Sequence, residues 1–200
     1  MACAGGVRLP APALDAAPAT GTQTVVLAGG CFWCTEAVFE ELKGVTGVVS
    51  GYAGGKAADA HYEMVSSGAT GHAESIQITF RPADISYGKI LQVFFSVAHD
   101  PTSLDRQGPD WGKQYRSAIF YQGEEQKKVA EAYIRQLTEA KVLPKAIVTQ
   151  VVPLNGFYPA EAYHQDFVKN NPDHPYVVVN ARPKLAKLHH EFPELLKKGK

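Results

Sequence analysis

The chain lacks the features that mark nucleic-acid binders, membrane-spanning proteins and disulfide-rich domains. Its 20 basic and 20 acidic side chains balance, so net charge gives no reason to expect nucleic acid or an anionic membrane as a partner. No apolar run reaches the roughly 18–20 residues that a membrane-spanning helix needs. Three cysteines in 200 residues are too few for a disulfide framework. What remains is a single domain with a sizeable core and a small or neutral group as its expected ligand.

Two of the three cysteines stand close together, and this spacing is typical of redox chemistry. Cys31 and Cys34 form a C-x-x-C motif, whereas Cys3 lies far away in the N-terminal segment. A closed zinc site needs four ligands. The histidines are scattered, and only His189 and His190 are adjacent. We therefore expect no metal site and interpret the motif as a redox pair.

The two ends of the chain differ in composition from the middle. Residues 1–22 are rich in Ala, Pro and Gly without apolar periodicity, so we expect a disordered N-terminal segment. Cys3 followed by Ala-Gly-Gly resembles the start of a processed bacterial lipoprotein, but the apolar segment that should precede such a cysteine is absent. The expected location is the cytoplasm, with the bacterial cell envelope or periplasm as the alternative. Residues 23–200 form one expected domain, with a basic, loosely packed or solvated tail from about 183.

Short apolar runs and amphipathic segments interleave irregularly through this domain. Strands are expected at 24–28, 45–52, 74–80, 115–121 and 146–152, and helices at 34–42, 62–65, 86–98, 124–140 and 160–169. The stretch 100–113 holds Pro, Gly and Asp with little periodicity, and a loop of this length is often functional. The pattern predicts an α+β fold, a mixed α/β two-layer sandwich with a ferredoxin-like core and long loops.

Cys31 lies between a Gly-Gly turn and the first turn of an expected helix. Unpaired backbone N–H groups and the helix dipole favour an anion at that place. Such a position lowers a thiol pKa from about 8.5 towards 7 or below. Cys34 follows one turn later on the same face, within reach of an oxidised Cys31. The alternative is that both cysteines are small buried hydrophobic residues, but the strand–Gly-Gly–Cys–helix context favours a nucleophile.

Two aromatic residues, Phe32 and Trp33, stand between the cysteines. Neighbouring residues on a helix cannot both point inward, so at least one of them should face the site. Methyl groups and sulfur make favourable contacts with aromatic faces. A Phe-Trp wall would therefore suit a substrate with a methyl or thioether group, although ordinary core packing is the alternative for both side chains.

The residues around the cysteines resemble those of the A-type peptide methionine-S-sulfoxide reductases. The resemblance rests on GGCFWCTE at 29–36, SGYAGG at 50–55, YEMVSSGATGHAE at 62–74, RQGPDWGKQYRSAIF at 106–120 and FYPAEAYHQDF at 157–167. These motifs occur in order and span roughly residues 24–180. The resemblance implies that Cys31 is the nucleophile that attacks the sulfoxide sulfur. It also implies that Phe32 and Trp33 form the pocket for the substrate's S-methyl group.

The same resemblance implies roles for four polar residues. Glu74 matches the acid that protonates the sulfoxide oxygen, and Tyr62 and Tyr115 match hydroxyl donors around that oxygen. Asp110 matches a residue that positions substrate or a water. The chemistry fits, because a carboxyl kept neutral by a partly apolar pocket supplies a proton and phenols donate without adding charge. Taken alone, Glu74 reads as a solvated acid at a strand edge, the tyrosines as packing residues and Asp110 as a loop cap.

The resemblance leaves the second half-reaction more open than the first. Its product is methionine plus a sulfenic acid on Cys31, released through a disulfide that thioredoxin reduces. Many relatives carry recycling cysteines near the C-terminus, whereas no cysteine follows Cys34 here. Cys34 is therefore the expected resolving thiol, with Cys3 or direct attack by an external thiol as alternatives. We expect no bound cofactor, an external thioredoxin or dithiol as reductant, free or protein-bound methionine-S-sulfoxide as substrate, and a monomer.

Three other interpretations compete with this one. His72 beside Glu74, and His164 with Asp166, suggest a Cys–His–acid set, but a sulfoxide needs a proton donor more than the thiol needs a base, so we expect a structural His72. A thioredoxin-like disulfide oxidoreductase also uses C-x-x-C after a strand, although Phe-Trp inside the motif differs from the Gly-Pro type. The third is a non-enzymatic metal-binding or thiol-sensing module.

Overall fold

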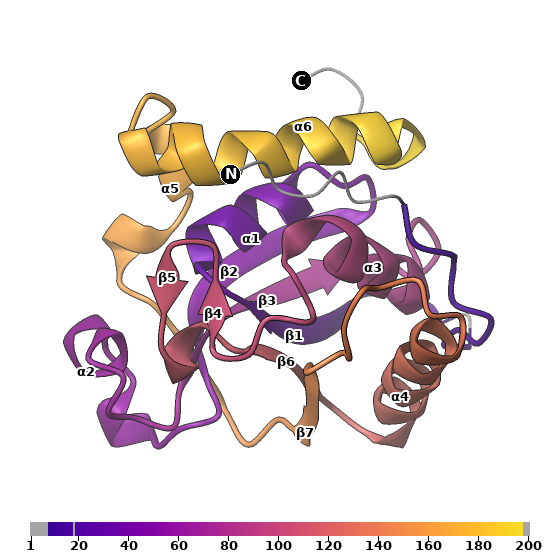
Figure 1. The fold of residues 1–200 in the computed structure, drawn as a ribbon, viewed down its shortest axis with the longest axis horizontal. Coiled ribbons are helices and arrows are strands. Elements are labelled where there is room, and N and C mark those ends of the chain that lie inside the picture. The colour runs from indigo at the N-terminus through magenta and orange to yellow at the C-terminus, as the bar shows by residue number, and fades with distance from the viewer. Residues whose placement is uncertain (1–7, 18, 198–200) are drawn as a thin grey trace.

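A six-stranded sheet of order β7-β6-β1-β3-β2-β8 forms the centre of the computed structural model, which describes residues 8–17 and 19–197 (Figure 1). All neighbouring strands are antiparallel except β6 and β7, which run parallel. Two short strands, β4 and β5, pair separately as an antiparallel ribbon. The strands are β1 Gln23–Gly29, β2 Val45–Ala53, β3 Ala73–Phe80, β4 Arg106–Gln107, β5 Asp110–Trp111, β6 Ser117–Tyr121, β7 Gln150–Pro153 and β8 Phe157–Pro159.

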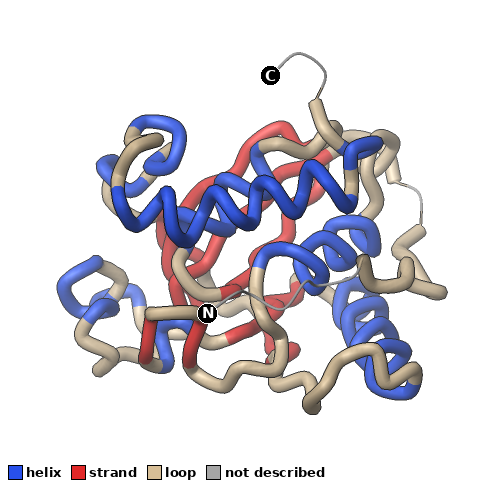
Figure 2. The backbone as a smooth tube through the Cα atoms, turned by 45° about the horizontal axis from the view of Figure 1, so that its top comes forward, coloured by secondary structure: helices blue, strands red, loops and turns tan. Residues whose placement is uncertain are grey.

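The helices gather on one side of this sheet, as the tube view shows (Figure 2). They are α1 Phe32–Glu40, α2 Tyr62–Ser66, α3 Tyr87–Val93, α4 Glu124–Glu139, α5 Phe167–Asn170 and α6 Arg182–Glu191. Short 3₁₀ or π turns lie at η1 Ala57–Asp59, η2 Phe94–Ala98, η3 Lys113–Tyr115, η4 Ala162–His164, η5 Val177–Ala181 and η6 Pro193–Leu195. No helix in the described part of the chain is long and apolar enough to cross a membrane.

The order of the four central strands identifies the core. Along the chain, β1, α1, β2, β3, α3 and β6 include a strand–helix–strand–strand–helix–strand series, and their strands lie in the order β6-β1-β3-β2. This is the ferredoxin-like arrangement. The predicted α+β fold with a ferredoxin-like core is therefore confirmed, and β7 and β8 extend the sheet at its two edges.

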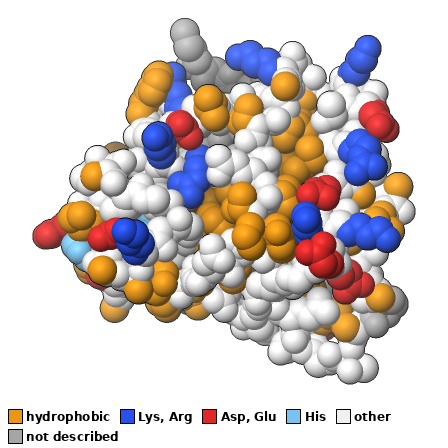
Figure 3. All heavy atoms as spheres, turned by 90° about the horizontal axis from the view of Figure 1, so that it is seen from below, with side chains coloured by type: hydrophobic (Ala, Val, Ile, Leu, Met, Phe, Trp, Pro, Cys, Tyr) orange, Lys and Arg blue, Asp and Glu red, His pale blue; other side chains and the backbone are white. Residues whose placement is uncertain are grey.

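Period-two alternation along β1 builds two hydrophobic layers of unequal size. Val25 and Leu27 belong to the large cluster formed with apolar side chains of α1, α3 and α4, whereas Val26 and Ala28 belong to a smaller one. That smaller cluster consists mostly of alanines, and partly buried residues of β7, of β8 and of the segment between them pack against it. Seen from below Figure 1, hydrophobic side chains gather near the middle of the surface and charged ones towards its edges (Figure 3).

Two expected helices are interrupted. The segment 86–98 forms α3, capped by the Ser86 hydroxyl that accepts from the Lys89 N–H, and then widens into the π turn η2. The segment 160–169 forms η4 and α5, which are separated by Asp166 at a positive φ of 52°. Sequence periodicity did not predict either break, because apolar spacing does not report local backbone geometry.

The N-terminal segment differs from the expected disorder wherever the structure describes it. Leu9 is buried, its N–H donates to the Ser96 hydroxyl (3.2 Å), and its C=O accepts from the Gln92 amide (2.6 Å). The Tyr133 hydroxyl donates to the Pro10 C=O at 2.7 Å. These partners lie far from the N-terminal segment along the chain, and the composition of that segment cannot reveal such contacts. Residues 1–7, with Cys3, and residue 18 lie outside the described residues.

The basic tail also differs from the expected loose packing. It forms α6, which lies over α1 (Figure 1). Leu188 and Phe192 are fully buried, and the Lys184 ammonium donates to the Ala98 C=O at 2.6 Å. The few apolar residues of this basic segment are therefore enough to fix it to the domain.

We expect Leu188→Ala to lower the free energy of unfolding by roughly 2–5 kcal/mol, the usual cost of truncating a buried leucine. Urea denaturation followed by circular dichroism measures this change. His190→Ala on the same helix is the control: its side chain is 83% exposed, so the expected change is within about 0.5 kcal/mol. Equal effects of the two substitutions would show that α6 is not packed on the domain.

Candidate active site

Cys31 is the N-cap residue of α1, directly after β1. The connection is Gly30, whose φ of 87° lies in the left-handed region. A Cβ at Gly30 would come within 2.5 Å of the Gln107 side chain, so both the turn and the close approach require glycine. The Cys31 C=O accepts from the N–H groups of Cys34 and Thr35, which starts the helix. The sequence-predicted strand–turn–Cys–helix arrangement is therefore present.

The pKa of Cys31 differs from the sequence expectation. Burial raises the pKa of this thiol well above its usual value, and the nearby Cys34 and Glu74 add to the rise, while the Tyr176 hydroxyl opposes it. The pKa of Cys34 is lowered, mainly by its hydrogen bond with Cys31 and further by Lys184 and Tyr176. The position at a helix start favours a thiolate, but the cost of desolvating a charge outweighs it at Cys31.

Glu74 lies at the start of β3 and is 3% exposed. Its Oε2 accepts from the Phe32 N–H at 3.0 Å, so the carboxyl sits beside the first turn of α1. Burial raises the pKa of Glu74 to about 8, with Asp110 and Cys34 adding to the rise and the Phe32 N–H opposing it. At neutral pH the carboxyl therefore carries a proton, which is what a general acid requires.

Tyr176 links the ribbon to the cysteines and was missed by the sequence analysis. Its hydroxyl donates to Asp110 Oδ2 at 2.5 Å, and its side chain packs on the cluster that contains Cys31 and Cys34. Burial raises the pKa of Asp110, although Tyr176 and Lys184 oppose the rise. Tyr176 lies outside the motifs quoted above, and only its neighbourhood in the folded chain identifies it.

Two further tyrosines, Tyr62 and Tyr115, lie near the Glu74 carboxyl. Tyr115, at the end of η3, packs on the cluster that contains both cysteines, and Tyr62 begins α2. Burial and then the charge of Glu74 raise the pKa of both phenols. Both hydroxyls therefore stay protonated and able to donate at neutral pH, which suits the predicted roles around a developing negative oxygen.

Trp33, rather than Phe32, supplies the open aromatic surface. Phe32 is 1% exposed and belongs to the main core, while its backbone N–H binds Glu74 and its ring lies 5.0 Å from the His164 ring. The Trp33 ring stacks on Phe167 with centroids 3.7 Å apart and planes 7° apart, and Tyr176 meets it edge-on at 5.7 Å. We expected at least one of the two aromatic residues to face the site, and Trp33 is the one with an open ring surface.

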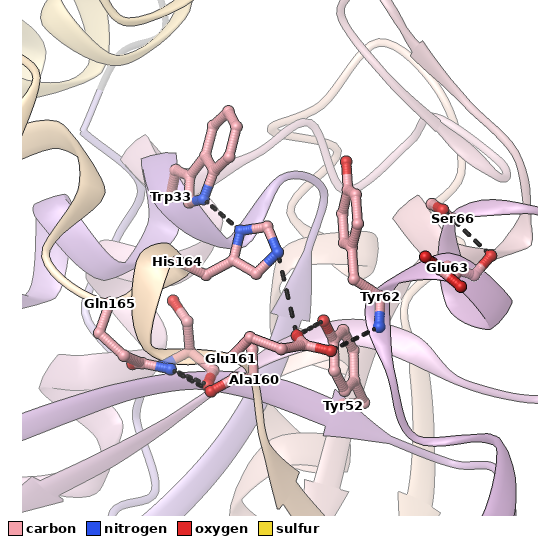
Figure 4. Close-up of polar contacts among 10 residues, drawn as sticks. Trp33, Tyr52, Tyr62, Glu63, Ser66, Ala160, Glu161, His164 and Gln165 are labelled. Carbon is pink, nitrogen blue, oxygen red and sulfur yellow. Dashed lines mark hydrogen bonds and ion pairs between the residues drawn. The ribbon is translucent and has the colours of Figure 1, made fainter.

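Side chains of the segment 160–167 hold Trp33 and Tyr62 in place (Figure 4). The Trp33 indole N–H donates to His164 Nδ1 at 3.0 Å, and the Tyr62 ring lies 4.5 Å from the His164 ring. Glu161 accepts from the Tyr62 N–H (2.9 Å) and from the Tyr52 hydroxyl (2.8 Å). Burial lowers the pKa of His164, which keeps the imidazole neutral and able to accept from Trp33. His164 thus positions Trp33 instead of serving as a base for the thiol.

His72 occupies a different place. Its Nδ1 accepts from the Gly55 N–H at 3.2 Å, and its Nε2 lies 2.9 Å from the Lys56 C=O. Both ring nitrogens are therefore used by the backbone of the turn after β2, as a structural histidine would be. Within residues 8–17 and 19–197, no group of three or more His, Cys, Asp or Glu side chains is placed to hold a metal ion.

Comparison with known proteins yields one family. A family model described as peptide methionine sulfoxide reductase matches residues 23–196. A relative from Synechocystis sp., peptide methionine sulfoxide reductase MsrA 2, is 54% identical over 193 residues, which cover 94% of this chain and 90% of the relative. A peptide methionine sulfoxide reductase MsrA from Thermus thermophilus is 52% identical over 175 residues, covering 88% of this chain and 98% of the relative.

Two solved structures are similar in fold. The reduced form of Mxr1 from Saccharomyces cerevisiae superposes with a TM-score of 0.68 at 30% identity, covering 81% of this chain and 92% of that one. The methionine sulfoxide reductase A of Corynebacterium diphtheriae gives a TM-score of 0.65 at 31% identity, covering 80% and 89%.

We expect Tyr176→Phe to raise the pKa of Cys31, because the Tyr176 hydroxyl beside this thiol lowers that pKa. The rate of iodoacetamide alkylation tracks the thiolate fraction, and a Cys34→Ser background leaves one thiol in the site to follow. The midpoint of the rate against pH should move upward. Tyr163→Phe, at a side chain that is 62% exposed, is the control with an unchanged midpoint. An unshifted midpoint in Tyr176→Phe would mean that the hydroxyl does not act on this sulfur.

Proposed function

Since the chain belongs to the peptide methionine sulfoxide reductase family, we propose that it reduces methionine-S-sulfoxide, free or in proteins, to methionine with Cys31 as the nucleophile. The single observation that supports this most is the pairing of Cys31 with a protonated carboxyl. Glu74 lies buried against the first turn of the helix that Cys31 caps. The family relationship also favours this function over a thioredoxin-like disulfide oxidoreductase.

In the proposed first half-reaction, the Cys31 sulfur attacks the sulfoxide sulfur. Glu74 gives its proton to the sulfoxide oxygen, and Tyr62 and Tyr115 donate hydrogen bonds to that oxygen as negative charge builds on it. The transient S–S bond and the substrate's S–O bond then break as the protonated oxygen passes to Cys31 as a sulfenic acid, and methionine leaves. The proton that the Cys31 thiol lost on attack returns to Glu74. The substrate sulfur gains two electrons, and the Cys31 sulfur loses two. Asp110, hydrogen-bonded to Tyr176, positions the substrate beside the attacking sulfur.

The substrate's S-methyl group would lie on the Trp33 ring. This ring is fixed on one side by the Phe167 stack and at its edge by the bond to His164. Methyl and sulfur contacts with an aromatic ring are favourable, and a fixed ring accepts the methyl group in one orientation only. With the oxygen held by the donors around Glu74, this arrangement supports discrimination between the two sulfoxide epimers.

The proposed second half-reaction uses Cys34. It lies one helical turn after Cys31, and among the described cysteines it is the only other one. The Cys34 thiolate attacks the sulfenic sulfur, the S–S bond forms, and the oxygen leaves as water after taking up a proton. The lowered pKa of Cys34 supports this role. Cys3 lies outside the described residues and is the alternative resolving thiol.

The external reductant is proposed to be thioredoxin or another dithiol, with no bound cofactor, because the site contains the two thiols that the cycle needs. We also propose that the protein is a monomer and that it works in the cytoplasm. A reducing compartment suits a chain with three cysteines and no disulfide framework.

Turnover of the separated S and R epimers of a methyl sulfoxide, with dithiothreitol as reductant, tests the function. We expect reduction of the S epimer and little of the R epimer, and equal rates would contradict the assignment.

Glu74→Gln keeps the shape of the side chain but lacks the proton, so single-turnover reduction should slow by about 10²–10⁴-fold. Since the acid must be protonated, the wild-type rate should fall as pH rises through about 8, the pKa of Glu74.

The role of Cys34 is tested by Cys34→Ser. Without reductant, this variant should still reduce about one equivalent of sulfoxide and keep a sulfenic acid on Cys31, which a dimedone-type reagent traps. Turnover with thioredoxin should collapse, whereas dithiothreitol should restore much of it. Cys31→Ser is the control that abolishes the first equivalent. Normal thioredoxin turnover by Cys34→Ser would assign resolution to Cys3 or to thioredoxin itself.

A further inference from the structure

Trp111 is an unusually exposed large aromatic residue for its position. Its exposed fraction is 66%, and it follows Asp110 directly in β5. Single exposed apolar residues are ordinary on protein surfaces, so exposure alone carries no conclusion. Its orientation, its rigidity and its connection to the site make the case.

The ribbon formed by β4 and β5 has one face towards the site and one face outward. Its register pairs Gln107 with Asp110 and Arg106 with Trp111, and successive side chains of a strand point to opposite faces. Gln107 is 6% exposed, and its side chain lies against Gly30, the residue before Cys31. Asp110 reaches Tyr176. The outward pair, Arg106 and Trp111, is therefore carried by a ribbon whose other two residues contact the catalytic centre.

The outward pair is held in place. The Arg106 guanidinium lies 4.0 Å from the centre of the Trp111 ring, a distance typical of a cation–π contact. Arg106 Nε also donates to the Gly108 C=O at 2.9 Å. The Gly112 N–H donates to the Asp105 C=O at 2.9 Å, which closes the ribbon beyond Trp111. The indole ring is thus fixed before any ligand arrives, which lowers the entropy cost of binding.

We propose that Arg106 and Trp111 form a docking platform for an apolar side chain that flanks the methionine sulfoxide in a peptide or protein substrate. This inference rests on the proposed function and names a substrate class within it. Asp110, which is next to Trp111, positions the reacting residue, and an extended chain advances only about 3.3 Å per residue. Because the ribbon is only two strands wide, a substrate chain that passes over its edge beside Asp110 brings a side chain near the methionine onto the outward face, where free methionine sulfoxide has nothing to place.

The test compares two blocked peptides that contain methionine-S-sulfoxide, one flanked by leucines and the other by glycines. Dithiothreitol is the reductant, so that thioredoxin docking plays no part. Wild type should prefer the leucine-flanked peptide in kcat/KM. In Trp111→Ala this preference should shrink by roughly fivefold to tenfold, the usual scale for one aromatic contact. Trp111→Phe should retain most of it. Val142→Ala, at an exposed apolar residue after α4, is the matched control with the wild-type ratio.

Several outcomes would overturn the platform. An unchanged ratio in Trp111→Ala, or no preference in wild type, would mean that the ring does not contact the flanking residue. An equal loss on both peptides and on free methionine sulfoxide would mean that Trp111 only shapes the catalytic centre. A defect seen solely with thioredoxin would assign the surface to the reductant. Failure of wild type to reduce any S-sulfoxide would refute the proposed function itself, which is a different result.

Discussion

The hydrogen bond from the Phe32 N–H to the Glu74 carboxyl connects the two elements on which the site depends. Cys31 follows the end of β1, and Glu74 is the second residue of β3. Because these strands are antiparallel neighbours, both residues lie at the same end of the sheet. The carboxyl accepts from an N–H in the first turn of α1 that has no partner within the helix, and it is buried at that place. Sheet topology thus places an acid beside the nucleophile, and burial keeps that acid protonated.

Burial sets the charge state of the whole centre. Burial is the first cause of the raised pKa of the Cys31 thiol, of the carboxyls of Glu74 and Asp110, and of the phenols of Tyr62, Tyr115 and Tyr176. Burial is the main cause of the raised pKa of Cys31, and a charged Glu74 would add to it by repulsion. A protonated Glu74 removes that repulsion. The acid therefore serves the attack by giving its proton and by carrying no charge beforehand.

Local sequence signals predicted the parts of the site that lie in ordered motifs. Cys31, Glu74 and Tyr115 were named from motifs that resemble those of the family, and their proximity follows from the strand order of the folded sheet. Tyr176 was missed because the run Pro-Tyr-Val-Val-Val carries no signal for a π turn whose N-cap residue bonds Asp110 and packs beside the cysteines. The packing of Leu9 and α6 was missed for the same reason, since the partners are far apart in sequence. The rule that a helix start acidifies a thiol gave the wrong direction for Cys31, because it contains no desolvation cost.

The geometry of the cysteine pair bears on how an external thiol would reduce it. Cys31 is 8% exposed and Cys34 2%, and α6, which carries Lys184, covers α1. In a Cys31–Cys34 disulfide, the more accessible sulfur belongs to Cys31, so an incoming thiolate would attack there and displace Cys34. A thiol leaves faster when its pKa is lower, and Lys184 and Tyr176 lower the pKa of Cys34. The groups that make Cys34 an attacking thiolate in resolution thus also make it the better leaving group in reduction, and both steps require α6 to stay packed on α1.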